Sequence, residues 1–470
     1  MKSKIPFQFR ISFASTLCCA AVMSHFTATS ASAGTLYWDG NNAGATGNPP
    51  TASTVGGAGA WQPAADATPN WWNGTTYQLW NAAGGQDVAD FRGTGGAVTL
   101  GGNVAATKLN FLATTAVSLT TTGFTIDLGS TGVIDFNDSV NHVLTTPLKG
   151  SITLNATGSV RSLATSSHGF INGNNIDLTS TVVNFAANAN PIVLNHAGAL
   201  GAAGADVKVT RGLVLLGNVA AAPINYNAWD LELNGGILRA RFGISTFNGP
   251  VTLTANSSLM TRDADDVGQD AKLVFANTAT VALGANTLFI HSATLSAGVD
   301  LNGVISGTGG LTQQTSALAG AGNAAGTTTL NANNTYTGNT LVNNGTLALS
   351  STGGLKFVIG ADDVNNQISG TGAGTVSLDG LFTFDLTGAS TTINDSWNIV
   401  DVANLNESFG SNFSILGFSA DGGGILWNGS ANGASYQFSE TSGNLTVVPE
   451  PQAALLGGLG LLLLLRRRRG

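Results

Sequence analysis

Short apolar runs separated by small polar residues dominate the chain between residues 98 and 349. Representative runs are Phe124–Leu128, Val133–Phe136, Val182–Phe185, Leu213–Leu216 and Thr287–Ile290. Each run is four or five residues long, which is too short for a stable helix, and Gly, Asn, Thr and Ser lie between them. The pattern therefore predicts many short β-strands joined by tight turns.

One run shows strict alternation. In Leu238 to Phe242, the residues Leu238, Ala240 and Phe242 share one face, and Arg239 and Arg241 share the other. A period of two residues is that of a half-buried strand. We expect the three apolar residues inside and both arginines outside.

Strands about ten residues apart suit either a β-sandwich or a β-solenoid. A stretch of about 250 residues with no change of composition would be large for one sandwich, whereas a solenoid grows by adding coils and uses Gly and Asn at its corners. The predicted fold class is all-β: a β-solenoid, similar to a parallel β-helix, over residues 98–352.

Residues 34–97 contain five of the eight tryptophans, beside Asn-Gly turn signals. Large rings can close the open end of a β stack, so we expect an N-terminal cap. Sugar binding by the same rings is the alternative. Residues 353–447 carry more aromatic strands and glycine-rich turns, which predicts a small C-terminal β-domain.

Both ends of the chain have the features of targeting signals. Residues 1–33 have the basic start, apolar segment and small-residue site of a signal peptide, with cleavage after Ala31-Ser32-Ala33 and a mature chain beginning at Gly34. A lipoprotein signal at Cys18 or Cys19 is disfavoured, because the position three residues upstream of each lacks the apolar residue that such a signal uses.

Residues 448–470 form the second expected targeting signal. Pro449, Glu450 and Pro451 precede a short apolar segment, 453–465, and the block Arg466, Arg467, Arg468 and Arg469. Four guanidinium groups resist crossing a bilayer, so the tail should stop in the inner membrane as a short membrane helix. An ordinary anchor helix, the alternative, would need about 20 apolar residues.

This tail closely resembles the PEP-CTERM sorting signal of Gram-negative bacteria. The resemblance implies an exosortase as partner, export through the inner membrane, and display on the cell surface or in an extracellular matrix, often alongside extracellular polysaccharide.

A second resemblance lies within residues 301–349. Its signature residues fall in the order of the autotransporter-associated β-strand repeat: Asn334, Tyr336, Thr337, Gly338, Thr340, Val342, Gly345, Thr346 and Leu347. Gly338 and Gly345 are expected at corners that need positive φ, and Leu341, Leu347 and Leu349 are expected to point inward. The Trp-rich opening is similar to the start of many proteins with this repeat.

Composition limits the partners. The exported body would keep eleven of the 18 basic residues and 25 of the 26 acidic residues, for a net charge near −14. Such a balance argues against nucleic acid and anionic lipid surfaces as ligands. Both cysteines leave with the signal, so stability must come from burial and backbone pairing.

Candidate chemistry is sparse. Four histidines remain after export, His142, His168, His196 and His291, and no two have metal-ligand spacing. The acidic stretch 263–270 could collect Ca²⁺, but its spacing fits a solvated turn better. We expect no catalytic residues, no metal site and no cofactor.

Two function classes are left. The first is a non-enzymatic structural or adhesive surface protein whose partners are extracellular polysaccharide or other surface proteins. The second is a polysaccharide-active β-helix enzyme, either a lyase or a glycoside hydrolase, with paired carboxylates along one face. The scarcity of basic residues for binding acidic sugars favours the first.

Overall fold

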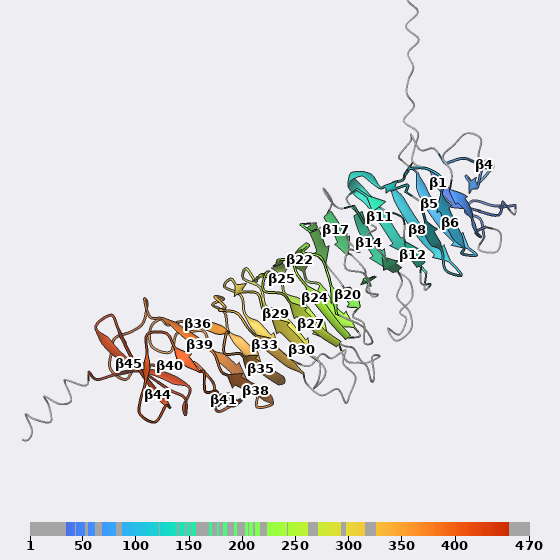
Figure 1. Cartoon of the computed structure of the whole chain (residues 1–470). Helices are drawn as coiled ribbons and strands as arrows, with labels where there is room; N and C mark the ends of the chain where they lie inside the picture. The colour runs from blue at the N-terminus through green and yellow to red at the C-terminus, as the bar shows by residue number, and fades with distance from the viewer. Residues whose placement is uncertain are drawn as a thin grey trace, which may run out of the picture. The chain divides into compact units, whose positions relative to one another are not determined.

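The computed structural model describes residues 34–450 except 43, 52–54, 62–67, 81–86, 122, 139, 141, 145, 147, 151, 157–168, 172–175, 178–181, 186–191, 195–202, 205, 210–211, 217–222, 242, 262–270, 293–297 and 315–325. The described chain is all-β (Figure 1). It contains one short 3₁₀ turn, Gly129–Thr131, and no α-helix within these residues.

The strands belong to six sheets. Sheet 1 has thirteen strands: β1 (Thr35–Trp38), β3 (Trp71–Trp72), β4 (Tyr77–Gln78), β5 (Val88–Gly93), β8 (Lys108–Ala113), β11 (Gly132–Phe136), β14 (Ile152–Ala156), β17 (Val182–Phe185), β19 (Asp206–Val209), β22 (Asp230–Asn234), β25 (Val251–Ala255), β28 (Val281–Ala282) and β31 (Ile305–Ser306). Sheet 2 also has thirteen: β2 (Gly59–Trp61), β6 (Ala97–Leu100), β9 (Ser118–Thr120), β12 (His142–Leu144), β15 (Gly169–Ile171), β18 (Ile192–Leu194), β20 (Gly212–Leu216), β23 (Ile237–Arg241), β26 (Ser257–Thr261), β29 (Leu288–Ser292), β32 (Leu311–Gln313), β34 (Thr340–Val342) and β37 (Ile368–Gly370).

The remaining sheets are smaller. Sheet 3 contains β7 (Val104–Ala105), β10 (Ile126–Asp127), β13 (Leu148–Lys149) and β16 (Ile176–Asp177). Sheet 4 contains β21 (Ile224–Asn225), β24 (Gly243–Phe247), β27 (Ala271–Phe275), β30 (Gly298–Leu301), β33 (Thr327–Leu330), β35 (Gly345–Leu349), β38 (Gly374–Leu378) and β41 (Asn406–Phe409). Sheet 5 contains β36 (Gly354–Val358), β39 (Leu381–Asp385) and β42 (Ser414–Ile415), and sheet 6 contains β40 (Ser396–Asn398), β43 (Ser419–Ala420), β44 (Leu426–Ala431), β45 (Ala434–Ser439) and β46 (Asn444–Val448).

Strand order explains how these sheets form. From β5 to β33 the chain visits sheet 1, then sheet 2, then sheet 3 or sheet 4, except that no described third strand lies between β18 and β19. Each strand pairs in parallel with the strand of the same sheet from the circuit before it, and from β36 to β42 sheet 5 takes the place of sheet 1. The circuits of sheet 1 differ in length: the one that separates the partners Val88 and Lys108 is short, and the one that separates Ile152 and Val183 is longer. This many-stranded parallel arrangement is compatible with the expected solenoid.

Like residues stack on like inside the sheets. Phe91, Phe111 and Phe136 are register neighbours in β5, β8 and β11, and their ring centroids lie 5.1 Å apart at both steps. All three rings are fully buried. The alternating pattern therefore places one residue of each circuit directly over its counterpart in the next.

The run around Leu238 gives a mixed result. Leu238 and Ala240 are fully buried, as expected, and Phe242 lies outside the described residues. The prediction for Arg239 is wrong, because its side chain is only 4% exposed. Its register neighbour on β26, Met260, also faces outward and is also buried, at 2% exposure. Alternation assigns a side chain to a face, but it does not reveal whether that face is covered.

Sheets continue across both expected domain limits, although sheet 5 begins at Gly354, beside the expected limit at residue 353. Sheet 1 already includes β5, before residue 98, and sheets 2 and 4 continue past Gly353 through β37, β38 and β41. Only sheet 6, which begins at Ser396, is antiparallel throughout. The parallel stack thus extends into the region expected to be a separate domain.

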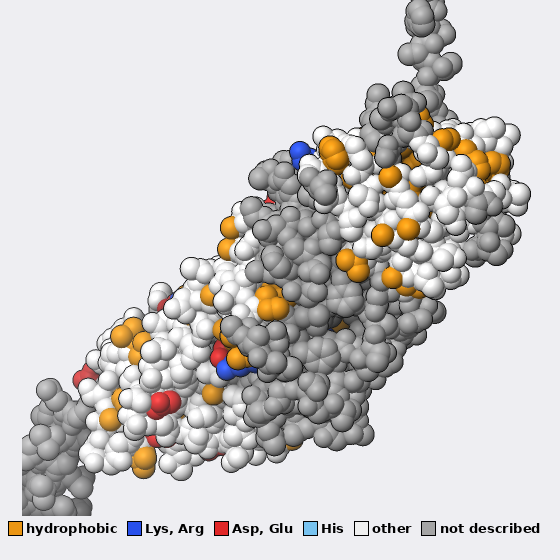
Figure 2. Space-filling view, turned by 45° about the vertical axis from the view of Figure 1, so that its right-hand side comes forward, with side chains coloured by type: hydrophobic (Ala, Val, Ile, Leu, Met, Phe, Trp, Pro, Cys, Tyr) orange, Lys and Arg blue, Asp and Glu red, His pale blue; other side chains and the backbone are white. Residues whose placement is uncertain are grey.

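Among the described atoms of the face in Figure 2, uncharged polar side chains and backbone predominate, and hydrophobic side chains form small separate groups. No helix in the described part of the chain has the length and apolar character that crossing a membrane requires. The expected membrane segment, 453–465, lies outside the described residues.

Candidate functional site

Four tryptophans form a closed cluster near the start of the described chain. Trp38, Trp61, Trp71 and Trp80 are each at most 1% exposed. Neighbouring ring centroids lie 4.6 to 5.1 Å apart, and Phe91 joins the cluster at 5.7 Å from Trp71. Because these rings pack against one another, none of the four presents a face on which a sugar could stack. Their geometry suits the expected cap.

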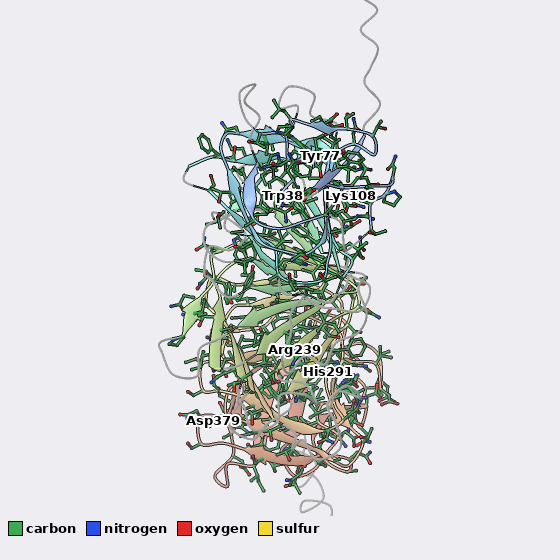
Figure 3. The ribbon with its side chains drawn as sticks, turned by 90° about the vertical axis from the view of Figure 1, so that its right-hand side faces the viewer. Trp38, Tyr77, Lys108, Arg239, His291 and Asp379 are labelled. Atoms are coloured by element: carbon green, nitrogen blue, oxygen red, sulfur yellow. The ribbon has the colours of Figure 1, made fainter. Side chains whose placement is uncertain are left out.

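The cluster is fixed to the first circuit by its polar edges. The indole N–H of Trp38 donates to Gly57 O at 2.9 Å, and that of Trp80 donates to Ala105 O at 2.8 Å. Figure 3 labels Trp38 and Tyr77 in this part of the molecule. Antiparallel pairing of β3 with both β1 and β4 extends sheet 1 at its N-terminal end.

The repeat residues fasten one circuit to its neighbours. Asn334 is 4% exposed; its Oδ1 accepts the Ile305 N–H at 2.9 Å, and its Nδ2 donates to Ala332 O at 2.8 Å and to Gly354 O at 3.2 Å. Tyr336 is 2% exposed, its hydroxyl lies 2.6 Å from Thr340 Oγ1, and burial raises the pKa of Tyr336. The sequence marks these positions, and the structure supplies the contacts.

Three expectations for the repeat can be compared with the geometry. Gly345 has φ +75°, and Leu347 and Leu349 are buried, as expected. Gly338 has no positive φ; a Cβ there would lie 2.4 Å from Gly309 O, so close backbone approach explains the glycine. The prediction for Leu341 is wrong, because Thr340 and Val342 take the inward positions of β34.

Thr337 and Thr346 complete the described signature. The Thr337 N–H donates to Gly307 O at 2.9 Å, and the Thr346 N–H donates to Gly326 O at 3.1 Å. These bonds join backbone segments about one circuit apart. The signature therefore encodes contacts between circuits, and its polar side chains serve packing.

Charged side chains also join consecutive strands, which the sequence analysis did not foresee. Lys208 lies 2.7 Å from Glu232, Lys272 lies 2.6 Å from Asp300, and Lys356 lies 2.9 Å from Asp385. A fourth pair of this kind joins Lys108 to Asp135. In each pair the acid stands one strand further along the stack. The hydrogen bond from Lys208 is the main reason that the pKa of Glu232 is lowered.

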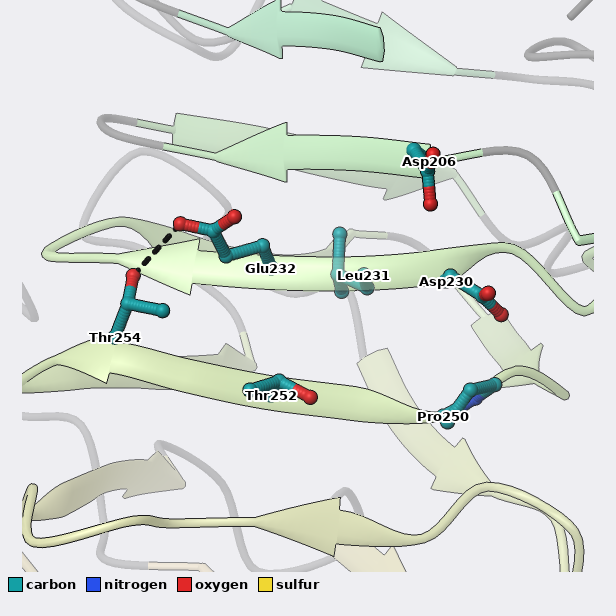
Figure 4. A pocket seen from close by; sticks show the side chains of 7 residues that line it. All are labelled: Asp206, Asp230, Leu231, Glu232, Pro250, Thr252 and Thr254. Carbon is teal, nitrogen blue, oxygen red and sulfur yellow. Dashed lines mark hydrogen bonds between the residues drawn. The ribbon is translucent and has the colours of Figure 1, made fainter. Parts of the chain in front are cut away.

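A groove of about 330 Å³ lies on sheet 1 across β19, β22 and β25. Asp206, Asp230, Glu232 and Thr254 are among its lining residues (Figure 4). Asp206 and Asp230 are register partners on adjacent strands and both are exposed. Glu232 accepts a hydrogen bond from Thr254 Oγ1 at 2.8 Å. The groove therefore brings two exposed carboxylates side by side, beside a third that is held ionised.

One histidine has a fully defined environment. His142 is fully buried against Phe111, at 4.8 Å between ring centroids. Its Nδ1 accepts the Val117 N–H at 3.1 Å, so the proton of the neutral ring belongs on Nε2, which lies 2.9 Å from Asp138 Oδ1. Both ring nitrogens make hydrogen bonds within the fold, which identifies His142 as a structural residue.

The sorting and cleavage residues can be placed only in part. Pro449 and Glu450 are exposed and follow β46 directly. Pro451, Arg466, Arg467, Arg468 and Arg469 lie outside the described residues, as do Ala31, Ala33, His168, His196 and the acidic stretch 263–270. The N–H of Gly34, the expected first residue after cleavage, donates to Asp87 Oδ1 at 3.0 Å.

Among the described residues, no group of three or more His, Cys, Asp or Glu side chains is placed to share a metal ion. No family model matches the chain, and no curated protein matches it. The two resemblances therefore stay predictions based on residues 448–470 and 301–349.

Proposed function

We propose that the chain is a β-solenoid with three strands in a typical circuit, a tryptophan cap at its N-terminal end and an antiparallel sheet following its C-terminal circuits. Support comes from the repeated order of sheets 1, 2 and 4, the stacked phenylalanines, and the buried cluster of Trp38, Trp61, Trp71 and Trp80. Each circuit adds buried rows at about 25 cal/mol per Å² of apolar surface.

On this scaffold we propose a non-enzymatic structural or adhesive protein of the bacterial surface or extracellular matrix, exported by its signal peptide and sorted by an exosortase. The observation that carries this proposal is the run of parallel pairings through sheets 1 and 2. Antiparallel strands extend sheet 1 at its N-terminal end, and the separate antiparallel sheet 6 follows the C-terminal circuits. Such a stack can serve as a rigid spacer.

The sorting step would act on an accessible motif. Pro449 and Glu450 are exposed immediately after the last strand, Asn444–Val448. A membrane enzyme could therefore reach them without unfolding sheet 6. Residues 453–465 would hold the chain in the membrane meanwhile, and extracellular polysaccharide or other surface proteins would be its partners afterwards.

The groove on sheet 1 favours a second candidate, a polysaccharide-active enzyme. Asp206 and Asp230 on adjacent parallel strands resemble the paired carboxylates of a glycosidase. A general acid, however, needs a raised pKa, whereas Lys208 lowers the pKa of Glu232, the best-buried carboxylate of the groove. We therefore rank this candidate second.

An activity assay on the purified proteins distinguishes the two candidate functions. The full chain, its Asp206→Asn variant and its Asp230→Asn variant would be incubated with neutral and acidic polysaccharides, and new reducing ends and unsaturated products measured. The structural proposal predicts no product from any of them. Turnover by the wild type that either substitution abolishes would establish the enzyme and refute the structural proposal.

A further inference from the structure

A buried carboxylate lies at the edge of the tryptophan cluster. Asp39 follows β1 directly and is fully buried. Its Oδ2 accepts a hydrogen bond from the Tyr77 hydroxyl, whereas its Oδ1 has no hydrogen-bond partner among the described residues. An ionised carboxylate that is out of water and half satisfied is costly, so this position calls for a further partner.

A second buried oxygen belongs to Asn70, the residue that pairs with Asp39 through the backbone. The Asp39 N–H donates to Asn70 O at 2.9 Å, which extends the antiparallel register Trp38↔Trp71 by one residue. Asn70 is 7% exposed, and its Nδ2 donates to Ala60 O at 3.1 Å. Because that carbonyl can only accept, the amide orientation is fixed, and Oδ1 is the atom left without a described partner.

The local charges do not neutralise Asp39. The guanidinium of Arg92 holds both oxygens of Asp90 at 2.7 Å and lies 4.7 Å from the ring centroid of Tyr37. Tyr77 brings no charge: its oxygen accepts the N–H groups of Gly44 and Ala45, at 3.1 and 2.6 Å, and its single proton goes to Asp39. The pair of Asp39 and Asn70 thus offers two acceptors and one negative charge.

We propose that Asp39 Oδ1 and Asn70 Oδ1 bind a calcium ion within the N-terminal cap. Carboxylate and amide oxygens are the ligands that Ca²⁺ takes, and backbone carbonyls or water complete its coordination. The hydrogen bond from Tyr77 orients the carboxylate as an outer partner. The ion joins β1 to β3, its antiparallel neighbour at the N-terminal end of sheet 1, and so fastens the cap.

Terbium luminescence tests this directly, since Tb³⁺ replaces Ca²⁺ and is excited through nearby tryptophans. The full chain in detergent would be stripped with EDTA and titrated with Tb³⁺, and Ca²⁺ would then be added as competitor. We expect tryptophan-sensitised emission that Ca²⁺ displaces, and a melting temperature that Ca²⁺ raises. Asp39→Asn should weaken the binding by at least about tenfold. Asp206→Asn, which alters an exposed carboxylate, should leave it unchanged.

A second variant covers the case in which Asp39→Asn does not fold. Asn70→Asp adds a charged ligand, so it should tighten Tb³⁺ and Ca²⁺ binding while lowering the melting temperature in EDTA. The proposal is overturned if the wild type shows no sensitised binding, or if Asp39→Asn binds Tb³⁺ as tightly as the wild type does. A protonated Asp39 would instead leave the wild type insensitive to Ca²⁺, with Asp39→Asn at least as stable, and this outcome also overturns the proposal.

Discussion

Phe111→Ala should destabilise the stack locally and strongly. Phe111 is fully buried in β8, with Phe91 and Phe136 at 5.1 Å on either side and His142 at 4.8 Å. Removing such a ring costs about 3–5 kcal/mol from lost burial and the cavity it leaves. Two stacked neighbours place Phe111 toward the upper part of that range, because aromatic pairs contribute beyond their area.

Hydrogen exchange is the suitable assay, since stacked circuits open locally and one melting temperature would average over them. A loss of about 3–5 kcal/mol corresponds to a fall in protection of about two to four orders of magnitude for amides of β5, β8 and β11. Leu112→Ala is the matched control, because Leu112 is adjacent but 40% exposed. Its effect should stay within about 0.5 kcal/mol. Equal protection in the two variants would refute the stacked core.

Three further outcomes follow from single contacts. We expect signal-peptide cleavage to turn the Gly34 nitrogen into an ammonium beside the Asp87 carboxylate. Asp87→Asn should then lower the free energy of unfolding of the processed protein by up to about 1 kcal/mol in urea titrations, and an unchanged midpoint would contradict the pairing. Asn334→Ala should lower the free energy of unfolding by about 1–3 kcal/mol in the same assay, because the buried N–H of Ile305 loses its acceptor. Asn333→Ala, at an exposed neighbouring residue, should leave the free energy of unfolding nearly unchanged. Equal losses in the two variants would refute the stabilising role of the Asn334 amide. The hydrogen bond from Lys356 lowers the pKa of Asp385 to about 2, from an ordinary value near 4. The ionised Asp385 therefore stabilises the folded protein above pH 4, and this stabilisation is lost as the pH falls toward 2. Asp385→Asn should flatten that part of the profile of melting temperature against pH, and an unaltered profile would contradict this prediction.

The alternation of apolar residues predicted the local structure well, because a strand face is set by a period of two. Leu238 and Ala240 are buried on the basis of that period alone. Sheet membership and parallel direction depend on partners a full circuit away along the chain, such as Val88 and Lys108, and only a repeated circuit length could hint at them. The circuits vary in length, so no fixed period is visible.

The alternation of apolar and polar residues could not predict which outward-facing side chains are buried. Arg239 and Met260 stand on the outer side of sheet 2 and are nevertheless buried, at 4% and 2% exposure. Likewise, Thr340 takes an inward position that Leu341 was expected to share, because the Tyr336 hydroxyl satisfies the buried Thr340 oxygen. Hydrophobicity ranks residues correctly only where no specific polar partner is present.

Of the candidate sites, the sequence marked the repeat residues but missed the groove and the buried Asp39. Asp206 and Asp230 are separated by a whole circuit of the chain, so only the parallel register brings them together. Asp39 stands beside tryptophans in an ordinary Asp-Gly turn signal, and nothing in the sequence shows that its carboxylate is enclosed. The groove and the enclosed carboxylate are produced by tertiary packing, so the sequence pattern does not reveal them.

Cell fractionation with mass measurement tests the central claim, an exported protein sorted by its tail, most directly. Cells that contain the exosortase would express the wild type and a variant with Pro449, Glu450 and Pro451 all replaced by alanine. We expect both to lose the signal peptide, with the variant staying unprocessed in the inner membrane while the wild type reaches the surface. Arrival of the variant at the surface, with the mass and yield of the wild type, would contradict sorting by the tail.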